Sequence, residues 1–185
     1  MIQTLAGFKH KHLVTIEKYW IVPNYLLFIE MEAPDPVSLW KSFCRQSFTS
    51  DEILNVLKQV VMGLEFLHAQ NYIHRDVHPS RIQHFAGGVV KFNTVGLPYN
   101  FKKLLRRSDF SGHVNYSAPE LILEKNSFSE KIDIWALGCC IYFIFNKCDP
   151  FDGKDPHVIK QKILNFNMIH AHHENGLDAK KTAIR

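Results

Sequence analysis

Three short motifs constrain this chain more than its composition does. They are His74-Arg75-Asp76, Ala118-Pro119-Glu120 and Asp133-Ile134-Trp135-Ala136-Leu137-Gly138. Before the first motif, apolar residues recur every three or four positions, which predicts a long amphipathic helix that begins at Thr49-Ser50-Asp51-Glu52 and ends near His68. Any one of these motifs alone is weak evidence, whereas the three in this order are hard to attribute to chance.

Composition places the chain among globular proteins. With 185 residues, 46% of them hydrophobic and 22% charged, it can bury a core of ordinary size. The balance of 22 Lys and Arg against 18 Asp and Glu gives a net charge of +4, too small to argue for nucleic acid. The longest apolar run, residues 134–145, is too short for a membrane span, and the first residues lack the layout of a signal peptide. We therefore expect a soluble, cytoplasmic protein that binds neither membrane nor nucleic acid.

The predicted elements are a short helix, a hairpin, and then mostly helices with a second small hairpin. Residues 13–22 and 25–31 are rich in β-branched and aromatic side chains and flank Pro23-Asn24, which predicts the first hairpin. Gly87-Gly88 lies at the centre of the second hairpin. By pattern alone the chain is an α+β domain. Later helices are expected from Pro119, over residues 132–145 and over residues 158–163.

At these motifs the chain resembles a protein kinase of the serine/threonine type. The HRD, APE and DxWxxG motifs occur in the family's order and at its spacing. His78-Pro79-Ser80 is similar to the Lys-Pro-x of serine/threonine kinases, and residues 112–120 are similar to the substrate-binding end of the activation segment. Residues 27–32 resemble the last strand of the N-terminal lobe and the hinge, with Ile29 in the gatekeeper position. The resemblance implies a protein-kinase-like α+β fold, mainly the helical C-terminal lobe with a remnant β-hairpin of the N-terminal lobe.

The resemblance also implies two parts of unequal size. Residues 1–32 correspond to a remnant of the N-terminal lobe: the end of the ion-pairing helix, two strands and the hinge. Residues 33–185 correspond to the C-terminal lobe, truncated at its C-terminal end. The family's glycine loop and strand lysine would lie before residue 1, so a truncated kinase domain is expected. In the hinge, Glu30 and Glu32 are the candidate cofactor-binding residues.

The positions that the resemblance assigns to catalysis depart from the family's chemistry. Arg81 stands at the catalytic-loop Asn that binds metal, and a cation there would repel Mg²⁺. Thr94 stands at the Asp of DFG, where a hydroxyl is a poor substitute for a carboxylate. His78 replaces the catalytic-loop Lys, and His113 replaces the threonine expected after Gly112. We therefore expect a degenerate kinase domain without a metal site.

Asp76 is the single catalytic side chain that the resemblance leaves, as the group that would accept the proton of the substrate hydroxyl. A general base contributes about 10²–10⁴-fold, and only once the phosphates and the nucleophile are in place. We therefore interpret Asp76 as vestigial. A scaffold of the catalytic loop is expected from His74, Arg75 and Asp133, and the end of the activation segment is marked by Ala118, Pro119 and Glu120.

Three functions are consistent with this sequence. The first is a pseudokinase that binds or regulates an unidentified protein partner, and it needs no cofactor. The second is a fragment of an ATP- and Mg²⁺-dependent serine/threonine kinase whose nucleotide-binding lobe is missing from this chain. The third is a truncated product with no independent role. We favour the first because Thr94 and Arg81 lie inside the chain, where truncation cannot account for them.

Two further segments and the degenerate catalytic positions each have a functional and a structural interpretation. The basic run 101–108 could dock an acidic partner or place Ser108 in a phosphorylation site, or it could be a solvated loop. Residues 170–174 carry metal-ligand side chains, or they form a polar tail. Cationic residues at the degenerate catalytic positions could bind phosphate without metal, or these positions drifted once catalysis was lost. In each case we favour the second interpretation.

Overall fold

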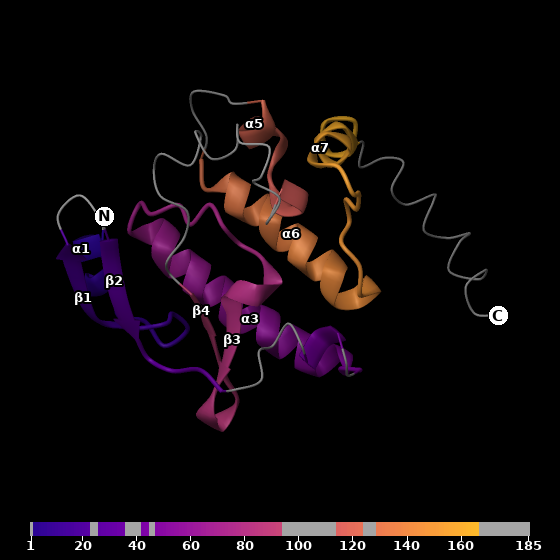
Figure 1. The fold of residues 1–185 in the computed structure, drawn as a ribbon. Coiled ribbons are helices and arrows are strands. Elements are labelled where there is room, and N and C mark those ends of the chain that lie inside the picture. Colours follow the sequence, from indigo (N-terminus) through magenta and orange to yellow (C-terminus); the bar gives the residue numbers. More distant parts are fainter. Residues whose placement is uncertain are drawn as a thin grey trace.

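The computed structural model describes residues 2–22, 26–35, 42–44, 47–93, 114–123 and 129–166. Thr94, His113 and the segments 101–108 and 170–174 lie outside the described residues. Figure 1 shows α3 and α6 running through the middle of the molecule, with α1, β1 and β2 at one end. The mixture of helices and short sheets confirms the α+β class. In chain order the helices and strands are α1 (Ile2–Gly7), β1 (Ile16–Val22), β2 (Leu26–Met31), α3 (Ser50–Ala69), β3 (Ile82–Phe85), β4 (Val89–Phe92), α5 (Pro119–Ile122), α6 (Lys131–Asn146) and α7 (Pro156–Leu164).

The first predicted hairpin is confirmed. β1 and β2 pair antiparallel, with Trp20 opposite Phe28, and α1 packs against one face of the pair. β1 begins later than the sequence pattern suggested, because Leu13 forms a bridge to Phe92 of β4 and is 1% exposed. Leu13 therefore joins the hairpin to the rest of the molecule instead of extending it.

The helix α3 begins at the predicted site. Thr49 caps it: the Thr49 hydroxyl accepts from the Glu52 N–H, and the Glu52 carboxylate accepts from the Thr49 N–H. Two residues of the repeating apolar pattern, Leu54 and Val61, are nevertheless 60% and 46% exposed. Gln59 is buried instead, because its side-chain oxygen accepts a hydrogen bond of 2.8 Å from the Val90 N–H. A polar side chain can occupy a core position when its partner is supplied by another element.

The second hairpin and α6 position the loop of residues 73–81, which contains His74-Arg75-Asp76. β3 pairs with β4 in antiparallel register, and Gly87 and Gly88 adopt φ of +75° and +74° in the turn, a region that favours glycine. The helix α6 is apolar on most of its surface, as expected of a helix that lies in a core. None of the helices in the described ranges is long and apolar enough to cross a membrane. Asp133 is the charged residue that α6 buries, at 1% exposed.

Candidate functional site

The loop of residues 73–81 connects α3 to β3, and Asp133 of α6 holds its backbone. One carboxylate oxygen, Oδ2, accepts from the His74 N–H and from Nε2 of His68, both at 2.8 Å. The other, Oδ1, accepts from the Arg75 N–H at 2.8 Å. Arg75 has φ of +68°, a left-handed conformation that is costly for a residue with a Cβ. The two backbone bonds to Asp133 therefore fix the loop at its most strained residue.

His74 is fully buried and holds a single neutral tautomer. The Asp76 N–H donates to its Nδ1 at 3.2 Å, so the ring proton is on Nε2, which donates to the Asn93 carbonyl at 2.6 Å. The ring also lies 4.5 Å from that of Phe92. Burial lowers the pKa of His74, although the nearby carboxylate of Asp133 acts in the opposite direction.

This burial predicts a loss of stability in mild acid. The unfolded chain takes up a proton on His74 near pH 6.5, whereas the folded chain does so only at lower pH. The free energy of unfolding should therefore fall as the pH drops below about 6.5, by at most about 1.4 kcal/mol per pH unit from this residue. Urea denaturation of wild type and of His74→Gln at several pH values between about 7 and 5.5 measures the slope.

The control is His157→Gln, because His157 is exposed on α7. We expect His74→Gln to reduce the dependence on pH, whatever its effect on absolute stability, and His157→Gln to preserve it. A His74→Gln protein with the slope of the wild type would show that another group sets the response to acid.

Asp76 lies two residues after His74, and Arg81 neutralises it. The Asp76 side chain is 1% exposed, and its Oδ2 accepts from Nε of Arg81 at 2.9 Å and from Nη2 of the same guanidinium. Nε2 of His78 lies 3.6 Å from the other carboxylate oxygen, and Nδ1 of His78 lies 2.9 Å from the Ser80 hydroxyl. One of the two Asp76 oxygens that could receive a substrate proton is thus already bonded to a cation.

These residues do not fit a magnesium site. Mg²⁺ requires oxygen ligands in near-octahedral geometry, whereas the groups around Asp76 in the described loop include a guanidinium and an imidazole. The Asp76 carboxylate is the one acidic group in the described loop that could bind the metal, and Arg81 already compensates its charge. The other family position for a metal ligand, Thr94, lies outside the described residues.

The two hinge candidates both lie near basic side chains of the protein, and Glu32 is hydrogen-bonded. Oε1 of Glu32 accepts from the Thr15 N–H at 2.6 Å, and its Oε2 accepts from Nζ of Lys91 at 2.5 Å. Burial alone would raise the pKa of Glu32, but the hydrogen bonds from Lys91 and Thr15 lower it overall. Glu30 lies 3.8 Å from Lys18 of β1. Sequence reasoning missed the bond between Glu32 and Lys91, because 59 residues separate the two side chains along the chain.

The end of the activation segment packs against the turn after α6. Ala118 is buried at the start of α5, and Pro119 and Glu120 form its first turn. Just before it, the Tyr116 hydroxyl donates to Asp149 at 2.6 Å, and burial raises the pKa of this hydroxyl. The sequence alone did not reveal the Tyr116–Asp149 bond, because nothing local links residues 33 positions apart.

Comparison with known proteins identifies relatives of this chain. The profile of the family described as "Protein kinase domain" matches residues 2–183. The chain is 27% identical over 163 residues to striated muscle preferentially expressed protein kinase of Danio rerio, covering 87% of this chain and 5% of that protein. It is 30% identical over 139 residues to mitogen-activated protein kinase kinase kinase 1b of Physcomitrium patens, covering 75% and 18%. The chain therefore spans less than a fifth of the length of either relative.

A solved structure shares the fold. The crystal structure of the yeast RNA Pol II CTD kinase CTDK-1 complex contains a chain that matches with a TM-score of 0.69 at 24% identity. The match covers 89% of this chain and 55% of that chain. The family profile covers nearly the whole sequence, and the fold matches that of a solved kinase complex. The chain belongs to the protein kinase family.

Proposed function

We propose that this chain is a catalytically inactive kinase-fold protein, a pseudokinase, that binds or regulates other proteins in the cytoplasm without a cofactor. The observation that carries the proposal is the ion pair between Arg81 and Asp76. Phosphoryl transfer depends on neutralising and positioning the phosphates with metal ions, and on an aspartate that receives the hydroxyl proton. Here the aspartate is bonded to a guanidinium that stands where the family has a metal ligand.

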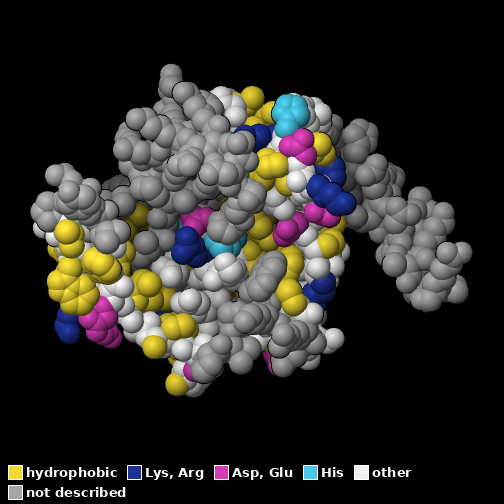
Figure 2. All heavy atoms as spheres, in the orientation of Figure 1, with side chains coloured by type: hydrophobic (Ala, Val, Ile, Leu, Met, Phe, Trp, Pro, Cys, Tyr) yellow, Lys and Arg dark blue, Asp and Glu magenta, His cyan; other side chains and the backbone are white. Residues whose placement is uncertain are grey.

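The surface of the hairpin supports a role in binding proteins. Large apolar side chains on β1 and β2 are exposed, among them Trp20 at 52%, Ile21 at 61% and Phe28 at 51%. Figure 2 shows hydrophobic side chains gathered at the end of the molecule where Figure 1 has these strands. Contiguous exposed apolar surface is typical of protein interaction sites. The solved yeast structure of similar fold is itself a kinase complex.

Catalysis and nucleotide binding are tested together. We expect no phosphate transfer from radiolabelled ATP with Mg²⁺ to a general protein substrate above the background of the Asp76→Asn variant. We also expect the melting temperature to be unchanged by ATP, with or without Mg²⁺. Transfer by the wild type that Asp76→Asn abolishes would overturn the proposal and favour a fragment of an active serine/threonine kinase.

A further inference from the structure

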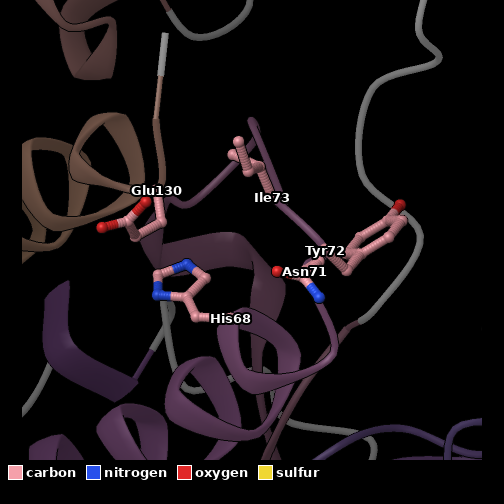
Figure 3. Close-up of a pocket in the computed structure, with 5 residues that line it drawn as sticks. All are labelled: His68, Asn71, Tyr72, Ile73 and Glu130. Atoms are coloured by element: carbon pink, nitrogen blue, oxygen red, sulfur yellow. The ribbon is translucent and has the colours of Figure 1, made fainter.

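A small cavity lies between the end of α3, the residues that follow it and the start of α6. It has a volume of about 130 Å³ and is lined by His68, Asn71, Tyr72, Ile73 and Glu130. Figure 3 shows the Glu130 carboxylate, the His68 imidazole and the oxygen of Asn71 around one space, with the Tyr72 ring directed away from it. Pockets that hold drug-sized ligands measure about 300–1,000 Å³, so this cavity suits one side chain and is too small for a nucleotide.

The groups around this space are mainly hydrogen-bond acceptors. Glu130 is ionised at neutral pH, since its own backbone N–H and the Lys131 ammonium lower its pKa. His68 bonds to Asp133 through Nε2, which leaves Nδ1 as an acceptor in the neutral ring. The amide of Asn71 directs its oxygen into the same space. A ligand that satisfies these groups must therefore donate several hydrogen bonds.

Most of the charges nearby favour a cation, although the Arg75 guanidinium, whose Nε donates to the Ile73 carbonyl at 3.2 Å, acts in the opposite direction. The cavity lies at the C-terminal end of the 20-residue helix α3, the negative end of its dipole. The N-terminal end of α6 is positive, but Glu130 and the buried Asp133 place two carboxylates there. Lys131 shows that Glu130 attracts an ammonium group, because its Nζ lies 3.4 Å from the carboxylate while its side chain is 73% exposed. A more deeply placed cation would replace this exposed contact.

We propose that the cavity binds one guanidinium or ammonium group, presented by an arginine or lysine side chain of a protein partner. The chemistry of the group follows from the acceptors and charges of the cavity. The inference that a protein partner presents this cationic group rests on the proposed function. Glu130 forms the ion pair, and Asn71 and His68 accept the remaining N–H bonds.

The test uses three small probes and no nucleotide, at pH 8 and low salt. Binding of acetyl-Gly-Arg-Gly-amide is followed by two-dimensional NMR, beside the same peptide with neutral citrulline in place of arginine, and beside spermidine. We expect the arginine peptide to bind about tenfold or more tightly than the citrulline peptide, with shifts centred on Asn71 and Ile73. Equal binding of the two peptides, or no binding, would overturn the site. Tighter binding of spermidine than of the arginine peptide would overturn the protein source and assign a free polyamine.

Variants on either side of the ion pair sharpen the test. Glu130→Gln should weaken binding of the arginine peptide about tenfold, whereas Lys131→Ala should strengthen it by removing the competing ammonium. Glu17→Gln is the matched control, since Glu17 is an exposed glutamate on β1, and it should change nothing. An unaltered affinity in Glu130→Gln with an unchanged melting temperature would refute the assignment. Phosphate transfer by the chain would overturn the proposed function while leaving these binding results standing.

Discussion

Replacing Asp133 with alanine should lower the free energy of unfolding by about 4 kcal/mol or more. The carboxylate is 1% exposed and accepts three hydrogen bonds, from the N–H groups of His74 and Arg75 and from the ring of His68. Removing it leaves these donors buried without the acceptor and releases Arg75 from its strained conformation. Since a domain of this kind has about 5–15 kcal/mol in total, we expect a large unfolded fraction at 37 °C.

Two substitutions calibrate that result. Asp133→Asn keeps the shape and one acceptor oxygen, but its NH₂ group must face at least one of the three donors, so a loss of about 2–3 kcal/mol is expected. Asp152→Ala removes an exposed aspartate from the turn before α7 and should cost less than about 0.5 kcal/mol. Denaturant unfolding followed by circular dichroism measures all three. A small effect of Asp133→Ala, similar to that of Asp152→Ala, would show that the loop does not depend on this carboxylate.

The elements of the fold were predictable from the sequence because their signals are local. The Thr49 cap, the Gly87-Gly88 turn and the apolar run of α6 each occupy a few neighbouring residues, and each element begins close to where its pattern does. The buried face of α3 was less predictable. Glutamine is usually exposed, but Gln59 is buried because its side chain accepts a hydrogen bond from the Val90 N–H of β4.

The candidate site likewise has residues that the sequence predicts and contacts that it does not. Motifs identify His74, Asp76 and Asp133, because their order along the chain is itself the signal. The substitution at Arg81 is visible in the sequence, but its bond to Asp76 is not, since an arginine there could equally point into solvent. The links Glu32–Lys91 and Tyr116–Asp149 carry no local signal at all, because each depends on how distant segments pack. The sequence therefore identifies the side chains of the candidate site, whereas their charged partners depend on how distant segments pack together.

Arg81→Met should cost about 3 kcal/mol, because it leaves the buried carboxylate of Asp76 without the guanidinium. The reverse change, Asp76→Asn, should cost less, since the Arg81 side chain is 29% exposed and can turn towards water. If the two residues stabilise the loop mainly through each other, the double variant should be more stable than Arg81→Met alone. We expect a coupling energy of about 2 kcal/mol from the double-mutant cycle.

The pH dependence of Arg81→Met distinguishes the loss of the guanidinium charge beside Asp76 from the loss of the packing of the Arg81 side chain. A buried carboxylate that has lost its guanidinium has a raised pKa, so the folded variant binds a proton that the unfolded chain still lacks. Its deficit relative to wild type should therefore shrink as the pH falls from about 7 towards 5. Lys58→Met, at an exposed position on α3, should show no such recovery. A deficit that is constant with pH, together with additive single variants, would mean that Arg81 acts through its hydrocarbon stem. Coupling with recovery would instead assign Asp76 a structural role in this loop, through its ion pair with Arg81.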